Sequence, residues 1–158
     1  MTKYLLDANI FDEILKNTEI CRKLIELRRA GLILFIGTWI EASELTAISS
    51  ANPEKWLEMS ELLSGLEVVQ VPVAGMILNH SKISETALIS WSECEILGKS
   101  IKQSGKNEND MAIAMTAKRE NATLVTNDLE MQKKAKSILS AVVIDWAEFA
   151  SKCMTGNL

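Results

Sequence analysis

Two acidic side chains directly follow short apolar runs of the sequence. Asp7 follows a Tyr-Leu-Leu run and Asp128 follows Leu-Val-Thr-Asn, while Glu41 and Asp110 stand where segments with helical spacing begin. Two carboxylates about 4 Å apart repel by roughly 4 kcal/mol at an effective dielectric of 20, so four together need protons or cations to offset them. Mg²⁺ and Mn²⁺ prefer oxygen ligands and keep several waters. If the fold brings these acids together, the pattern predicts a divalent-cation site that can also bind a phosphate.

The elements that must position the acids alternate along the chain. Short apolar runs alternate with longer segments of helical spacing, which is typical of a parallel sheet covered by helices on both faces. The runs are rich in Val, Ile and Leu without polar alternation, as strands buried on both faces should be. We predict an α/β fold with three α/β/α layers, in which a central parallel sheet has four or five strands in the order 3-2-1-4-5. The predicted strands are residues 3–6, 32–36, 68–71, 123–126 and 142–144.

The predicted sheet places the acids at one edge. In open parallel sheets, ligands bind outside the carboxyl ends of the strands, at the point where the strand order reverses. Here that point lies between the first and fourth strands, which carry Asp7 and Asp128. Glu41 begins the helix after the second strand, and Asp110 begins the helix before the fourth. We therefore expect the four carboxylates to converge at this edge.

The helices and the domain organisation follow from spacing and capping residues. No linker, repeat or low-complexity stretch divides the chain, so residues 1–158 are interpreted as a single domain. Residues 72–109, with His80, Trp91 and Cys94, match no motif, and residues 72–105 are expected to hold helices. The predicted helices elsewhere are a pair within residues 10–27 and single helices at 39–49, 53–66, 110–120 and 129–139.

Each of the four acids also fits a purely structural role. Asp7 suits a turn or a helix cap after its strand, and Asp128 with the Asn before it suits an N-cap. Thr38 and Glu41 fit the capping box T-x-x-E. Asp110 falls in a first helical turn, where the macrodipole favours negative charge by about 0.3 to 1 kcal/mol. These roles explain each acid alone, but they do not predict that all four fall at the ligand-binding edge of one sheet.

The composition limits the classes of function. The 158 residues are 47% hydrophobic and 24% charged, as in an ordinary compact domain. With 17 basic and 21 acidic residues the net charge is −4, so any contact with nucleic acid must be local. Three separated cysteines without a CxxC pair predict no disulfide framework or zinc site and favour a reducing cytoplasm. No apolar run approaches the about 20 residues of a membrane span, so we expect neither a membrane segment nor a signal peptide.

The acidic pattern resembles the PIN domain family, the metal-dependent nuclease fold of VapC-type toxins and of several RNA-processing enzymes. Four pieces match in order and together span nearly the whole chain. The resemblance implies that Asp7, Glu41, Asp110 and Asp128 are the catalytic acids and that they hold Mg²⁺ or Mn²⁺. The matching pieces are LDANI at 6–10, TWIE at 38–41, DMAIA at 110–114 and TND at 126–128.

The second acid of this set has two candidates. Glu44 lies one turn past Glu41 and is followed by Leu, as in the Glu-Leu pair often seen at that position of the family. We favour Glu41 because of its spacing from Thr38. Asn9 and Asn127 are nearby polar residues that we expect to support ligands or bound waters.

The resemblance implies an endoribonuclease that hydrolyses RNA phosphodiester bonds as the toxin of a toxin–antitoxin pair, with an antitoxin protein as partner and a homodimer as the assembly. The alternative is a PIN-like module that binds RNA or protein without cutting. A haloacid-dehalogenase-type phosphotransferase needs a second Asp where Asn9 stands, and no Gly-rich loop supports a nucleotide-binding Rossmann role. The basic residues that we consider for the RNA backbone are Arg28, Arg29, Lys118, Arg119, Lys133, Lys134 and Lys136.

Overall fold

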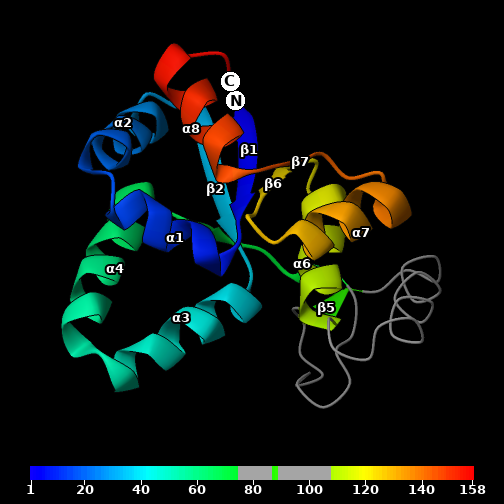
Figure 1. Cartoon of the computed structure of the whole chain (residues 1–158), viewed down its shortest axis with the longest axis horizontal. Coiled ribbons are helices and arrows are strands. Elements are labelled where there is room, and N and C mark those ends of the chain that lie inside the picture. Colours follow the sequence, from blue (N-terminus) through cyan, green and yellow to red (C-terminus); the bar gives the residue numbers. More distant parts are fainter. Residues whose placement is uncertain (75–86, 89–107) are drawn as a thin grey trace.

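The chain folds around a five-stranded parallel sheet (Figure 1). The structure is a computed structural model that describes residues 1–74, 87–88 and 108–158. The strands are β1 (Thr2–Leu6), β2 (Ile33–Gly37), β3 (Val69–Gln70), β6 (Thr123–Val125) and β7 (Val143–Ile144). Their spatial order is β3-β2-β1-β6-β7, which confirms the predicted order 3-2-1-4-5. All five predicted strands are present, with ends that differ from the prediction by one residue.

Successive side chains of β1 point to opposite faces of the sheet, because a strand has a period of two residues. Tyr4 and Leu6 join one buried apolar cluster, and Leu5 joins another. The neighbouring strand follows the same alternation, since Tyr4 pairs with Phe35 and Leu5 pairs with Ile36. The sheet is therefore buried on both faces, which explains why its strands lack polar alternation.

Helices cover both faces and complete the predicted three layers (Figure 1). The Tyr4 face is covered by α1 (Ala8–Leu15), α2 (Thr18–Arg29), α4 (Pro53–Leu66) and α8 (Trp146–Thr155). The Leu5 face is covered by α6 (Glu108–Arg119) and α7 (Leu129–Leu139). Helix α3 (Trp39–Ala51) contributes Ile40 to the Leu5 cluster and Leu45 to the Tyr4 cluster.

Capping residues fix several helix starts. The side chain of Asn52 accepts a hydrogen bond from the Lys55 amide at 3.1 Å, with Pro53 in the first helical position of α4, as the sequence predicts. The side chain of Asp145 accepts from the Glu148 amide at 2.8 Å and begins α8. Sequence analysis predicts no helix there, although an Asp before an apolar segment is an N-cap signal.

Two short strands lie outside the central sheet. β4 (Val73–Ala74) pairs in parallel with β5 (Ala87–Leu88). Both belong to the stretch in which helices were expected, and at these residues that prediction is wrong, because strands of two residues leave no period in a sequence. Three residues of this stretch, His80, Trp91 and Cys94, lie outside the described residues. None of the helices in the described ranges has the length and apolar character that a membrane span needs.

Candidate functional site

The topology brings the predicted acids to the carboxyl edge of the sheet. Asp7 directly follows β1, and its amide donates to the Val125 carbonyl of β6 at 3.0 Å. Asp128 follows the same end of β6 and caps α7. Glu41 lies in the first turn of α3, which follows β2. Asp110 lies in the first turn of α6, and because α6 leads back to the amino end of β6, this turn is also at the carboxyl edge.

The acids lie near enough for their charges to act on one another. Burial raises the pKa of Asp110, and the charges of Asp128 and Asp7 raise it further. Burial also raises the pKa of Asp7, as does the charge of Asp128, while hydrogen bonds to the carboxylate oppose the rise. Like charges disfavour ionisation of each neighbour, so this edge favours binding of a proton or a cation.

Asp7 occupies the N-cap position of α1, but its carboxylate is held by other side chains. It is 9% exposed, and its side chain makes no capping hydrogen bond to α1. Instead Oδ2 accepts a hydrogen bond from Nδ2 of Asn9 and another from Oγ1 of Thr126, each at 2.6 Å. Asp7 therefore holds the cap position that the sequence suggested, while its carboxylate is turned to Asn9 and Thr126.

Asp128 does take its predicted structural role. Its Oδ1 accepts hydrogen bonds from the amides of Glu130 at 2.8 Å and Met131 at 2.9 Å, which caps α7. Its own amide donates to Oγ1 of Thr126 at 3.1 Å. The cap fixes an exposed carboxylate whose charge reaches both Asp7 and Asp110. Capping and participation in the acid cluster are thus compatible for this residue.

Glu41 completes the predicted capping box. Its Oε2 accepts a hydrogen bond from the Thr38 amide at 2.8 Å and a second, shorter one from the Thr38 hydroxyl. Glu41 is 2% exposed, and its other oxygen, Oε1, is buried without a hydrogen-bond partner among the described residues. Burial, opposed by the bonds to Thr38 and assisted by the charge of Asp7, raises the pKa of Glu41 to about 7.

Glu44, the rival for the second acid, is more exposed and is coupled to more of the cluster. Partial burial is the largest cause of the raised pKa of Glu44, and the charges of Asp7 and Asp110 raise this pKa further. The charge of Asp7 also raises the pKa of Glu41. Oε2 of Glu41, however, is hydrogen-bonded to Thr38. The two glutamates of α3 therefore differ: Glu41 fixes the start of the helix, and Glu44 faces the charges of the cluster.

The donor set suits a hard divalent cation, although it is not a closed cage. Among the residues that the structure describes, no three His, Cys, Asp or Glu side chains converge as a ready-made ligand group. Mg²⁺ commonly binds through one or two carboxylates and keeps its remaining ligands as water. The buried, unpartnered Oε1 of Glu41 and the mutual repulsion of Asp7, Asp110 and Asp128 both fit such a bound ion.

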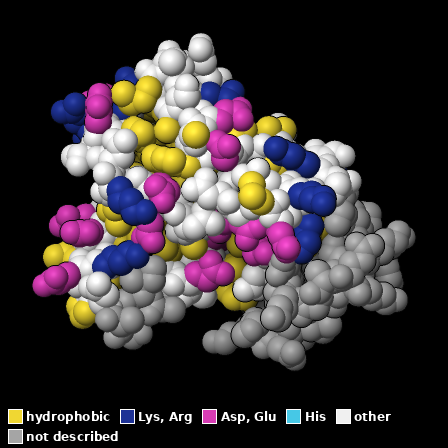
Figure 2. Space-filling model, in the orientation of Figure 1, with side chains coloured by type: hydrophobic (Ala, Val, Ile, Leu, Met, Phe, Trp, Pro, Cys, Tyr) yellow, Lys and Arg dark blue, Asp and Glu magenta, His cyan; other side chains and the backbone are white. Residues whose placement is uncertain are grey.

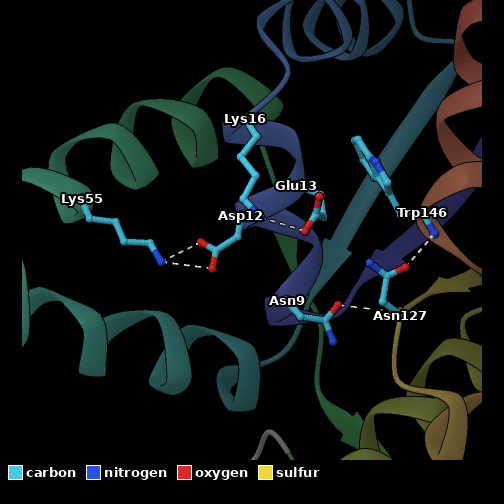
Figure 3. Close-up of polar contacts among 7 residues, drawn as sticks. All are labelled: Asn9, Asp12, Glu13, Lys16, Lys55, Asn127 and Trp146. Carbon is cyan, nitrogen blue, oxygen red and sulfur yellow. Dashed lines mark hydrogen bonds and ion pairs between the residues drawn. The ribbon is translucent and has the colours of Figure 1, made fainter.

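Two acids of α1 have basic partners, whereas Asp7 has none among the described residues. Lys55 of α4 lies 2.8 and 3.0 Å from the two carboxylate oxygens of Asp12, and Lys16 lies 3.0 Å from Glu13 (Figure 3). In the described ranges, no Lys or Arg lies within 4.0 Å of the Asp7 carboxylate. The negative charge at Asp7 is therefore available to a cation.

Asn9 and Asn127 form a polar connection beside the acids (Figure 3). Oδ1 of Asn9 accepts a long 3.5 Å contact from the Asn127 amide, and Oδ1 of Asn127 accepts from the Trp146 amide at 3.1 Å. Asn9 therefore links α1 to the loop after β6, and Asn127 links that loop to α8. These contacts support the acidic side chains rather than add to their charge.

Thr126 is the site residue to which sequence analysis assigns no role. It is fully buried, and its hydroxyl donates to Asp7 while accepting from the Asp128 amide. The available signal was a hydroxyl residue at the end of a buried strand two positions before an acid. Only the structure shows that this hydroxyl joins the two acids.

Comparisons with known proteins give a family and several structures of similar fold. A family model described as PIN domain matches residues 4–137. The chain is 24% identical to VapBC2 from Rickettsia felis bound to a DNA fragment from their promoter, with a TM-score of 0.57, covering 92% of this chain and 99% of that one. VapBC-1 from nontypeable Haemophilus influenzae is 23% identical, with a TM-score of 0.54 and the same coverage of both chains.

A further solved structure supports the same fold over almost the entire length. PAE2754 from Pyrobaculum aerophilum is 16% identical, with a TM-score of 0.57 and 98% coverage of each chain. No curated protein matches the sequence. The family match extends over most of the chain and includes all the acids described above, so this protein belongs to the PIN domain family.

Proposed function

We propose that this protein is an Mg²⁺- or Mn²⁺-dependent ribonuclease that hydrolyses RNA phosphodiester bonds. PIN domains are generally nucleases, and the observation that carries the proposal here is the position of the acids. Asp7, Asp110 and Asp128 stand at the carboxyl edge of the sheet, where ligands bind. The charge of Asp128 raises the pKa of both Asp7 and Asp110, which favours binding of a cation there. No phosphate-binding glycine loop or nucleophile–histidine pair competes with this site among the described residues.

The proposed acidic set is Asp7, Glu41, Asp110 and Asp128, joined by Glu44. When bound, the ion would supply an activated water and stabilise charge on the phosphoryl oxygens. Asp7, Asp110 and Glu44 are the proposed direct or water-mediated holders, because their charges are coupled to one another.

The remaining residues would keep these holders in place. Thr126 and Asn9 fix Oδ2 of Asp7, and the α7 cap fixes Asp128. Glu41 fixes the first turn of α3, from which Glu44 projects one turn later. Such supporting contacts typically change metal affinity or activity by about 10- to 100-fold when they are removed.

The wider biological role follows the structural neighbours. Two of the solved structures with this fold are VapBC assemblies. We propose that this chain is the toxin of such a pair, acts in the cytoplasm, assembles as a homodimer and is held by an antitoxin protein. Co-expression of the chain with the product of an adjacent gene, followed by purification as a complex, tests the partner directly.

The alternative is a PIN-like module that binds RNA without cutting it. Incubation of single-stranded RNA with the wild-type protein and Mn²⁺ separates the two. The nuclease requires cleavage that is lost in EDTA and in Asp7→Asn. RNA that binds but stays intact at millimolar Mn²⁺ would favour the alternative.

A further inference from the structure

Lys134 lies on the side of α7 that faces the acid cluster. It stands three residues after Met131, and positions three apart are neighbours on the surface of a helix. Met131 and Ala135 are buried in the cluster that also contains Met111 and Met115 of α6. The side chain of Lys134 is accordingly only 24% exposed, whereas the adjacent Lys133 is exposed.

The charged groups around Lys134 belong to the site. Its Nζ lies 3.6 Å from Oε2 of Glu130, one turn earlier on α7, and Glu130 is 77% exposed. The pKa of Asp110 is raised by burial and by other acids, and the positive charge of Lys134 acts in the opposite direction. An exposed i,i+4 pair contributes only about 0.3 to 0.5 kcal/mol, so Glu130 alone does not fix the ammonium group.

Four of the other basic residues considered for RNA binding lie elsewhere. Arg28 and Arg29 end α2, and Lys118 and Arg119 end α6; these helix ends lead into the amino ends of β2 and β6. Arg28 also pairs with Glu67 at 3.2 Å, and Arg119 pairs with the glutamate that follows it at 3.2 Å. They therefore lie at the edge of the sheet opposite to the acids.

The surface shows the same juxtaposition. In Figure 2, acidic side chains gather at the centre of the face, and basic side chains lie beside them over the region of α7 in Figure 1. The lysines of α7 are Lys133, Lys134 and Lys136, of which Lys134 is the less exposed. A phosphate bound at the acids would lie beside this positive charge.

We propose that Lys134 is the substrate-phosphate residue of the site and that, before substrate binds, its charge offsets that of Asp110. A lysine ammonium is a compact charge on a flexible stem, which lets it change partners without movement of the helix. A divalent cation at the acids would replace Lys134 as the counter-charge of Asp110. The ammonium would then contact a non-bridging oxygen of an RNA phosphate. This inference rests on the proposed ribonuclease function.

The test compares Lys134→Gln with Lys133→Gln, which makes the same charge change at the next, exposed position. Mn²⁺ affinity is measured by calorimetry in the absence of RNA. Loss of the competing positive charge in Lys134→Gln should tighten Mn²⁺ binding by on the order of threefold to tenfold, and Lys133→Gln should leave it near the wild-type value.

Cleavage of a single-stranded RNA oligonucleotide at a series of KCl concentrations measures the phosphate contact. One lost contact should raise KM and reduce the slope of log KM against log salt by about 0.7 in Lys134→Gln. Lys134→Arg should restore the slope, because arginine also binds phosphate. The control Lys133→Gln should keep the wild-type slope.

Two results would overturn the inference while leaving the nuclease in place. One is equal salt slopes for the two glutamine variants, and the other is unchanged Mn²⁺ affinity in Lys134→Gln, each with RNA still cut by the wild type. A wild-type protein that binds Mn²⁺ but neither binds nor cuts RNA would refute the proposed function and this inference together.

Discussion

The hydroxyl of Thr126 donates to Oδ2 of Asp7 at 2.6 Å, across a separation of 119 residues in the chain. Oγ1 of Thr126 also accepts a hydrogen bond from the Asp128 amide at 3.1 Å. A single buried hydroxyl therefore sets the position of one acid and the backbone of another. Asp7 stands at the end of β1 and Asp128 after β6, so Thr126 couples the two strand ends at which the site is built.

Replacement of this hydroxyl should impair both the site and the stability of the fold. Thr126→Val keeps the shape but removes the donor to Asp7, which should lower kcat/KM for RNA cleavage by about 10- to 100-fold. Loss of a hydrogen bond to a charged group should also cost about 1.5 to 3 kcal/mol of unfolding free energy at neutral pH. Thr126→Ser retains the hydroxyl and serves as the control. Equal kinetics for the valine and serine variants would contradict this role of Thr126.

Neutralisation of Asp7 should not destabilise the metal-free protein, because it relieves repulsion within the acid cluster. Thermal unfolding in EDTA should show Asp7→Asn at least as stable as the wild type. Saturating Mn²⁺ should stabilise only the wild type, by about 2.7 kcal/mol at a hundred times Kd.

The matched control for Asp7 is Asp12→Asn, in the helix that directly follows Asp7. Asp12 already pairs with Lys55 at 2.8 Å and is partly exposed, so its loss should cost less than about 1 kcal/mol and leave the response to Mn²⁺ intact. A melting temperature of the wild type that stays constant up to millimolar Mn²⁺ would count against the cation site.

The two glutamates of α3 should separate into a metal holder and a helix cap. Glu44→Gln should weaken Mn²⁺ binding by about 10- to 100-fold with little change in stability, because Glu44 is exposed and coupled to Asp7 and Asp110. Glu41→Gln can keep an acceptor for Thr38, so its metal affinity should change less. Calorimetric titration of both variants decides the assignment, and a larger loss of affinity in Glu41→Gln would reverse it.

Glu41 should make the metal-free protein less stable as the pH rises. Its pKa is raised from 4.5 to about 7 in the folded state, so the folded chain binds more protons than the unfolded chain between these values. The contribution of protonated Glu41 to the unfolding free energy is then fully present below about pH 4.5, and roughly 3 kcal/mol of it is lost by pH 7. Asp7, Asp110 and Glu44, whose pKa values are also raised, should add to the fall.

Chemical denaturation in EDTA at several pH values measures this effect. Glu41→Gln should lose most of the slope above pH 4.5 and retain the smaller part that the other acids contribute. A wild-type stability that is constant or rises between pH 5 and pH 7 would contradict the raised pKa values.

The sequence predicted the strands and their order because buried parallel strands have a recognisable composition. The helix at 129–139 was predicted with its observed ends, since Asp128 marks its start. The pairing of β4 with β5 could not be predicted, because two-residue strands depend on partners distant in the chain. The helix α8 was not predicted, although Asp145 at its start is a typical N-cap residue.

The sequence predicted the edge of the sheet at which the acids lie, but not the contacts that each of them makes. Strand ends and helix starts indicated the edge at which the acids meet. The sequence favoured Glu41 over Glu44 because of its spacing from Thr38, although Glu44 fits a pair often seen in the family. Spacing alone does not show that Glu41 is bonded to Thr38 through Oε2. The roles of Thr126 and Lys134 depend on side-chain directions that spacing alone does not give.

The alternation along β1 links the orientation of Asp7 to the integrity of both apolar clusters. Tyr4 and Leu6 belong to one cluster and Leu5 to the other, and Asp7 is the next residue. Insertion of a single residue between Tyr4 and Asp7 would move the side chains on one side of the insertion to the opposite face of the sheet. It would also turn the Asp7 carboxylate away from Thr126. The orientation of Asp7 therefore depends more on the length of β1 than on the identity of any one of its apolar residues.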